Sequence, residues 1–212
     1  MRLILPLAGV LLPLGLAAAQ APKPERLLIG STFGYGRSSL RLGDLKVQAI
    51  GGVYFGFLVH AHLGAPFAMQ PELIFTRRGG QELATRRDST VRVLLEQVYL
   101  DFPLLASLEL PFPAGRVRPH VYAGFAPAIR LGCDVQVVAG SPQEPPACSD
   151  QDFERMRGVD FGVAYGGGVD VRFPRITLRG DLRWTRGYVA AYRSGANQAL
   201  NRQRIITLGF AF

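Results

Sequence analysis

Gln203-Arg-Ile-Ile-Thr-Leu-Gly-Phe-Ala-Phe212, the stretch that decides the fold, alternates between two kinds of side chain. Side chains of a β-strand point alternately to opposite faces, so this stretch predicts a strand with one mostly apolar face. Lipid is a suitable solvent for that face when the strand closes a barrel in a membrane. Phe210 and Phe212 are therefore expected to form a C-terminal membrane-insertion signal for the barrel-insertion machinery. The more apolar face carries Arg204, Ile206, Leu208, Phe210 and Phe212.

Residues 1–19 have the pattern of a secretory signal peptide. Arg2 precedes an apolar run that ends at Leu16, and Ala17-Ala18-Ala19 supplies a small-residue cleavage site. The run is shorter than the roughly 20 residues that a membrane-spanning helix needs. We expect cleavage between Ala19 and Gln20, which leaves a short periplasmic segment over residues 20–25.

The composition of the chain narrows its class. It is 48% hydrophobic and 19% charged, and it contains 25 glycines. An exported chain of this kind without a spanning helix is either a β-sandwich or an outer-membrane barrel. The net charge of +8 comes mostly from arginine, whose planar guanidinium group binds the phosphates of lipid and lipopolysaccharide well. Export argues against nucleic acid as a partner.

Eight strand candidates follow one another, and their connections alternate in length. Long polar links cover residues 37–46, 79–90, 132–157 and 189–201, and short links lie at residues 61–65, at 111–117 and near Pro174. Outer-membrane barrels have short periplasmic turns and longer extracellular loops. We therefore predict an all-β fold, an eight-stranded antiparallel up-and-down transmembrane β-barrel over residues 26–212, with both termini periplasmic. The candidates are Arg26–Gly36, Val47–His60, Pro66–Arg78, Val91–Leu110, Arg118–Leu131, Gly158–Phe173, Arg175–Tyr188 and Arg202–Phe212.

The alternation within the candidates predicts an interior rich in charge. Five arginines against six carboxylates favour a lumen filled by ion pairs, because a lone buried charge is costly and an eight-stranded barrel is just wide enough for side chains to fill. A narrow gated ion path is the alternative. The expected lumen charge network is Glu72, Asp101, Glu109, Arg118, Arg130, Asp160, Asp170, Arg172, Arg179, Asp181 and Arg183.

Aromatic residues gather near both ends of the strand candidates. Amphipathic rings prefer the two membrane–water interfaces, so these positions predict aromatic girdles. The girdle residues are Phe67, Phe75, Phe161, Phe173, Trp184, Tyr188 and Phe212.

Four segments of the chain match a known family in order, and together they represent nearly all of the mature chain. They are Gln70–Gly80, Tyr99–Leu105, Pro119–Phe125 and the closing strand. On these segments the chain resembles the small porin-like outer-membrane β-barrel domain family of Bacteroidota-type envelopes, which includes PorT-like proteins. The resemblance implies an eight-stranded barrel without catalytic residues, and it leaves open an accessory role in secretion.

Two loop features predict further chemistry. Cys133 and Cys148 flank a proline-rich stretch in the longest outer link, and an exported pair of this kind predicts one disulfide. The second outer link and its flanks are rich in arginine, which suggests either lipopolysaccharide contact or a solvated loop. The arginines expected at that contact are Arg77, Arg78, Arg86, Arg87 and Arg92.

No catalytic, cofactor or metal site is predicted. His60 and His62 share a strand face, but no third ligand stands close in sequence, and no histidine has a serine at the spacing of an acyl hydrolase. A carboxylate pair of Glu72 and Asp101 has no nucleophile beside it, so a structural role is favoured.

The sequence favours a non-enzymatic outer-membrane barrel with a structural or adaptor role that displays four outer loops, and the resemblance leaves open a role accessory to secretion. A small porin for ions or solutes is the alternative. A lipid-modifying enzyme lacks a nucleophile and base, and a soluble ligand-binding barrel needs its apolar face turned inward. The expected partners are outer-membrane lipid, lipopolysaccharide, the insertion machinery and an envelope protein that the sequence does not name.

Overall fold

The computed structural model describes residues 27–42, 45–46, 48–86, 89–110, 115–138, 158–188, 192–194 and 197–212. The expected signal peptide over residues 1–19 and the short segment over residues 20–25 lie outside these ranges. No helix among the described residues is long and apolar enough to cross a membrane.

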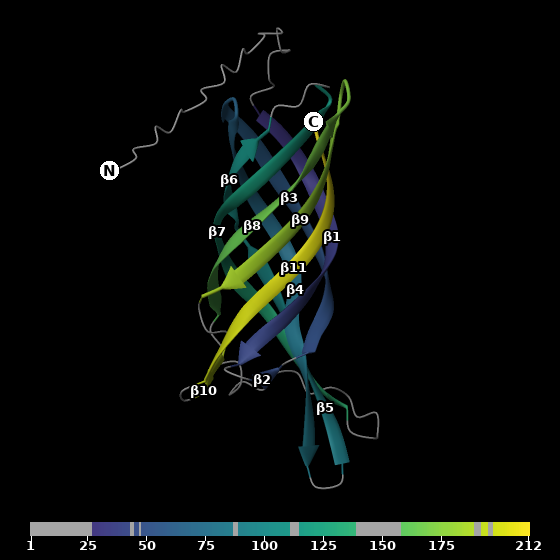
Figure 1. Ribbon diagram of the computed structural model, residues 1–212. Coiled ribbons are helices and arrows are strands. Elements are labelled where there is room, and N and C mark those ends of the chain that lie inside the picture. Colours follow the sequence, from purple (N-terminus) through teal and green to yellow (C-terminus); the bar gives the residue numbers. More distant parts are fainter. Residues whose placement is uncertain are drawn as a thin grey trace, which may run out of the picture.

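The described residues form one antiparallel sheet that closes on itself (Figure 1). Its strands are β1 (Leu27–Leu42), β2 (Leu45–Lys46), β3 (Gln48–Gly64), β4 (Phe67–Arg86), β5 (Ser89–Asp101), β6 (Leu104–Glu109), β7 (Val117–Val138), β8 (Val159–Arg172), β9 (Thr177–Gly187), β10 (Tyr192–Ser194) and β11 (Asn197–Ala211).

Closure of the ring depends on the pairing of the first and last long strands. β1 pairs with β11 over thirteen residues, from Gly30 opposite Ala211 to Leu42 opposite Ala199. The order around the ring is β1, β3, β4, β5 with β6, β7, β8, β9 and β11, which gives eight strand positions. The predicted eight-stranded antiparallel barrel is confirmed.

One predicted strand is interrupted. The candidate Val91–Leu110 consists of β5 and β6, separated by Phe102 and Pro103, and both parts pair with β4 and β7. Proline has no N–H group to donate to a ladder. The Phe102 N–H donates instead to the Pro127 carbonyl at 2.8 Å, and the Pro103 carbonyl accepts from Glu72 N–H at 2.9 Å.

The strands run further toward the long-connection end than the sequence predicts. The expected link over residues 79–90 is mostly strand, because β4 continues to Arg86 and β5 begins at Ser89. Figure 1 shows this hairpin extending beyond the other strands at the end opposite the C-terminus. Paired strands satisfy each other's backbone groups in water as well as in lipid. Residues 79–90 lack an apolar face in the sequence, so the predicted strands stop earlier than the strands of the structure.

The two faces of the sheet have the predicted inverted polarity. Along β9, Thr177, Arg179 and Asp181 are buried in the lumen, whereas Leu178 and Leu182 are exposed on the outside. Residues of β8 follow the same rule, with Asp160 and Asp170 inside and Val159 and Phe161 outside. This orientation is confirmed on both strands and gives the barrel an apolar outer band around a polar interior.

Candidate functional site

The centre of the lumen is crossed by an ion pair between opposite walls. Arg183 on β9 and Glu72 on β4 lie four strand positions apart in the ring of eight. Arg183 Nη1 donates to Glu72 Oε2 at 2.5 Å and Nη2 to Oε1 at 2.7 Å. This fork-to-fork geometry is the strong form of an arginine–carboxylate contact, and it spans the barrel.

Two tyrosines enclose this ion pair. The guanidinium carbon of Arg183 lies 5.5 Å from the ring centre of Tyr54 and 5.2 Å from that of Tyr122. The Arg183 Nη1 group donates to the Tyr54 hydroxyl, and Arg183 Nε donates to the Tyr122 hydroxyl at 3.3 Å. Gly166 makes room for this arrangement, because a Cβ atom there would lie 2.7 Å from Tyr122 Oη. Cation–π contacts are strongest when desolvated, so the rings reinforce the pair while filling space.

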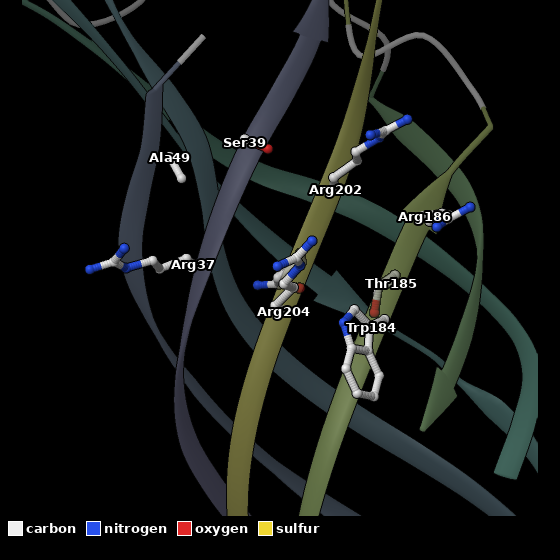
Figure 2. Close-up of a pocket in the computed structure, with 9 residues that line it drawn as sticks. Arg37, Ser39, Ala49, Trp184, Thr185, Arg186, Arg202 and Arg204 are labelled. Carbon is white, nitrogen blue, oxygen red and sulfur yellow. The ribbon is translucent and has the colours of Figure 1, made fainter. Parts of the chain in front are cut away.

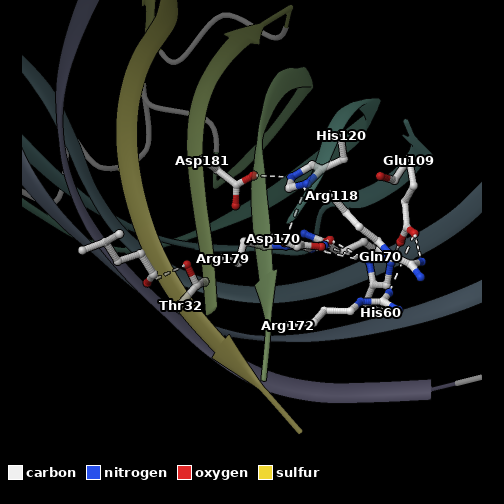
Figure 3. A network of polar contacts seen from close by, with 12 residues as sticks. Thr32, His60, Gln70, Glu109, Arg118, His120, Asp170, Arg172, Arg179 and Asp181 are labelled. Carbon is white, nitrogen blue, oxygen red and sulfur yellow. Dashed lines mark hydrogen bonds and ion pairs between the residues drawn. The ribbon is translucent and has the colours of Figure 1, made fainter. Parts of the chain in front are cut away.

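A second contact between opposite walls lies in the half of the lumen near the short turns (Figure 3). Arg179 on β9 binds Asp170 on β8 through two hydrogen bonds of 2.6 Å, and its Nη1 group donates to Gln70 Oε1 on β4. His120 and Asp181 extend the network, with Nε2 and Oδ1 2.6 Å apart. Every one of these side chains is buried.

Histidine and arginine side chains surround Glu109 at the same end. Its Oε1 atom lies 2.8 Å from His60 Nε2 and 2.9 Å from His62 Nε2, and its Oε2 atom accepts from Arg118 Nη1 at 3.2 Å. Arg172 Nη2 lies 3.0 Å from His62 Nε2. The two imidazoles and the carboxylate form a set that a metal ion can use, and Glu109 is the third ligand that sequence spacing did not reveal. Because two arginines crowd the same atoms, the contacts define an internal charge cluster.

A further charge cluster, around Arg78, lies nearer the long connections. The Arg78 Nη2 group donates to Asp101 Oδ2, and Arg78 Nη1 donates to Asp160 Oδ2 at 3.3 Å. Asn201 Nδ2 also donates to Asp160 Oδ2, at 2.7 Å. The ring of Tyr99 lies 4.9 Å from the guanidinium carbon of Arg78. These groups occupy the lumen on the long-connection side of the central pair.

Arg78 corrects one sequence-based assignment. It was expected at a lipopolysaccharide contact, yet the residue is 3% exposed and its side chain binds Asp101 and Asp160 inside the lumen. Arg77, its neighbour, is exposed and lies 3.4 Å from Glu96. Arg86 and Arg92 lie on β4 and β5 with undescribed side chains, and Arg87 lies outside the described residues.

The structure brings the eleven expected lumen charges into these clusters with few departures. Nine are buried, and Arg118 and Arg172 are partly exposed at the short-turn mouth. Arg130 on β7 is buried, 6% exposed. No pairing between Glu72 and Asp101 is seen among the described contacts; each binds an arginine instead.

The remaining expected residues lie on the surface or near it. Cys133 lies on β7, whereas Cys148 lies outside the described residues, so the disulfide stays a prediction. Phe210 and Phe212 point outward at the end of the chain. Of the seven expected girdle aromatics, Trp184 is partly exposed and the other six are exposed. The six are Phe67, Phe75, Phe161, Phe173, Tyr188 and Phe212.

Sequence reasoning missed the uncharged side chains that fill the lumen. Tyr54, Tyr99 and Tyr122 are buried, and Leu105 packs with Tyr122, Ala126 and Ala164. His60 and His120 also lie inside the lumen, and both are at most 2% exposed. The alternation of side chains along a strand could have revealed this position, because His60 stands six residues after Tyr54 on β3 and therefore shares its face.

The closed ring, the outward apolar band and the polar interior define an integral membrane β-barrel protein. The model of the family "Outer membrane protein beta-barrel domain" matches residues 18–187, so the chain belongs to that family. The protein is therefore an integral β-barrel protein of the bacterial outer membrane.

Solved structures with a similar outline have little sequence identity to this chain. Neisserial surface protein A is 10% identical, with 87% of this chain and 95% of that chain covered and a TM-score of 0.49. Ail of Yersinia pestis, solved with the heparin analogue sucrose octasulfate, is 13% identical, with 88% and 99% covered and a TM-score of 0.44. The outer membrane protein OprG from Pseudomonas aeruginosa is 11% identical, with 88% and 95% covered and a TM-score of 0.41. No curated protein sequence matches this chain significantly.

Proposed function

We propose that this protein is a non-conducting, non-enzymatic barrel with a structural or adaptor role in the cell envelope. The observation that carries the proposal is the pair of contacts that join opposite walls of the lumen, Arg183 to Glu72 and Arg179 to Gln70. Side chains that bind one another across the bore obstruct a water path at those heights. Arg183 and Glu72 also neutralise each other rather than remaining free to serve as acid or base.

The proposed orientation places both termini in the periplasm and the four long connections outside. Short turns join β3 to β4 and β8 to β9 at the end of the barrel that also holds the C-terminus (Figure 1). Outer-membrane barrels keep their short turns on the periplasmic side. The display surface of an adaptor is then the opposite end, where the hairpin of β4 and β5 projects.

An accessory role in secretion rests on the resemblance to PorT-like proteins. The proposed partners are outer-membrane lipid and lipopolysaccharide, an envelope protein, and the insertion machinery that binds the C-terminal strand with Phe210 and Phe212. Crosslinking in intact envelopes, followed by detergent extraction, tests the adaptor role. A specific crosslinked envelope protein is expected, and its absence would leave only the structural role.

Planar-bilayer recording tests whether the lumen conducts. Purified protein is expected to give no steady conductance above that of the protein-free bilayer. Replacing both Arg183 and Glu72 by alanine removes the central barrier and is expected to increase the frequency of brief openings. Leu182→Ala, an outward change on the same strand, is the matched control and should behave as the wild type. A steady large conductance of the wild-type protein would contradict the proposal and favour a small pore for ions or solutes.

A further inference from the structure

Four arginines gather on the outer face of the barrel where β1, β9 and β11 lie side by side (Figure 2). They line a pocket of about 340 Å³ together with Trp184 and Ser39. Arg37 is on β1, Arg186 on β9, and Arg202 and Arg204 on β11, and all four side chains are exposed.

The ladder register sets these arginines against one another. Arg37 is directly opposite Arg204, and Arg202 is directly opposite Arg186. Like charges at directly opposite positions destabilise a sheet. None of the four forms an ion pair with a carboxylate among the described residues, in contrast to the arginines of the lumen. A bound anion between the strands would relieve both repulsions at once.

The position of the arginine cluster relative to the apolar outer band indicates the source of that anion. The next outward residues toward the short-turn end are Leu182, two positions before Trp184, Tyr35, two before Arg37, and Ile206, two after Arg204. All three are exposed and belong to the apolar outer band. From Leu27 to Tyr35 the band covers about 27 Å along the strand at about 3.4 Å per residue. This length is at the lower end of the roughly 9–11 residues that a tilted strand needs to cross the hydrocarbon layer.

An aromatic stack marks the same boundary. The ring of Trp184 is stacked on Tyr165, with ring centres 5.9 Å apart, and Arg186 lies 5.8 Å from the Tyr165 ring centre. Tryptophan and tyrosine prefer the level of the lipid headgroups. The arginine cluster therefore begins where hydrocarbon ends and phosphate groups are found.

We propose that Arg37, Arg186, Arg202 and Arg204 bind the phosphate groups of an anionic lipid headgroup at the outer face of the barrel. Guanidinium groups match phosphate through two parallel hydrogen bonds, and several of them around one pocket suit a headgroup with more than one phosphate. This site is separate from the arginine-rich hairpin of β4 and β5. Its assignment to the outer leaflet rests on the proposed orientation, whereas binding in detergent does not.

The only tryptophan of the chain lines this pocket, so its fluorescence reports binding directly. Protein in a nonionic detergent is titrated with diphosphorylated lipid A, with lipid A from which both phosphates have been removed, and with inorganic pyrophosphate. We expect a saturable change with the first lipid and at least tenfold weaker binding of the second. Pyrophosphate alone is expected to bind at least tenfold more weakly than the phosphorylated lipid, because it lacks the chains that lie against the apolar band.

The double variant Arg37→Gln with Arg204→Gln is expected to lose at least tenfold in affinity for diphosphorylated lipid A. Its matched control is Arg116→Gln with Arg175→Gln, which removes the same charge from exposed arginines at the short-turn end. A gel shift on heating verifies that each variant is folded. Equal affinity of the double variant and the wild type, or equal binding of the dephosphorylated lipid, would overturn the proposal. Equally tight pyrophosphate binding would overturn the lipid source and make a soluble anion the ligand.

Discussion

Arg183 and Arg204 lie on neighbouring strands of the same barrel, yet their surroundings are opposite. Arg183 points inward, binds Glu72 through two hydrogen bonds and is enclosed by Tyr54 and Tyr122. Arg204 points outward, faces Arg37 across the ladder and has no carboxylate partner among the described residues. The interior neutralises its own charges, whereas the outer rim leaves positive charge for something outside the chain.

The difference indicates that the inner arginines contribute to stability and the outer arginines to ligand binding. Buried charges require partners within the protein because their desolvation is otherwise uncompensated. Exposed charges at a membrane interface can remain unmatched at small cost, since water screens them. We therefore expect substitutions inside the lumen to act mainly on folding, and substitutions at the rim to act mainly on lipid binding.

The largest effect is expected when the central pair loses one partner. Glu72→Ala leaves the guanidinium group of Arg183 buried without its carboxylate, which should lower the free energy of unfolding by about 3–5 kcal/mol. Urea unfolding in detergent micelles measures the change. Glu96→Ala is the matched control, because it removes the partner of the exposed Arg77, and such surface pairs contribute about 0–1 kcal/mol. Similar losses in the two variants would contradict the distinction between the interior and the surface.

A charge introduced on the apolar band tests the other side of the comparison. Leu208→Arg places a guanidinium group against the hydrocarbon layer, so it should destabilise the barrel in lipid vesicles by about 2–4 kcal/mol. Val159→Arg, at the long-connection end of the same outer face, should cost about 0–1 kcal/mol. Urea-dependent folding into vesicles checks both values. If the two substitutions cost the same, the apolar band does not face lipid as described.

The predicted disulfide acts outside both regions. A bridge between Cys133 and Cys148 closes a loop of about 15 residues and should stabilise the fold by about 3 kcal/mol at most. Alkylation of the unfolded, unreduced protein should label neither cysteine, and reduction should lower its resistance to urea. Quantitative labelling before reduction would show that the thiols are free.

The smallest expected effect is a gain in stability when one of the four outer arginines is replaced. In a nonionic detergent without anionic lipid, Arg204→Gln removes the repulsion from Arg37 and should stabilise the barrel by about 0.2–1 kcal/mol. Thermal unfolding at low salt measures this gain, which should shrink as added salt screens the charges. A clear loss of stability under these conditions would mean that Arg204 has a partner within the protein.

The sequence predicts the fold better than it predicts the partners of individual side chains. Alternation along residues 203–212 and along β9 shows which face meets lipid, because that face must be apolar at every second position. The same rule places Arg78 inside, since it stands six residues after Glu72 on an uninterrupted strand. Composition instead grouped Arg78 with its exposed neighbour Arg77, and that grouping was wrong.

Contacts between distant strands lie beyond such reasoning. Glu109 meets His60 and His62 only because β4 pairs with both β3 and β6. Arg37 and Arg204 become neighbours only when β1 closes on β11. Each contact depends on the register of the closed ring, which alternation within one strand does not determine.

The most direct test is the accessibility of spin labels along β11 in lipid nanodiscs. Single cysteines are introduced in a protein whose own two cysteines are replaced by serine. Labels at Ile206, Leu208 and Phe210 should collide with oxygen dissolved in lipid, with a maximum near Leu208. Labels at Thr207 and Ala211 should be shielded from oxygen and from a water-soluble nickel reagent, because they point into a filled lumen. Loss of this alternation would contradict the barrel's orientation, and free access of the nickel reagent to Thr207 would contradict its closed interior.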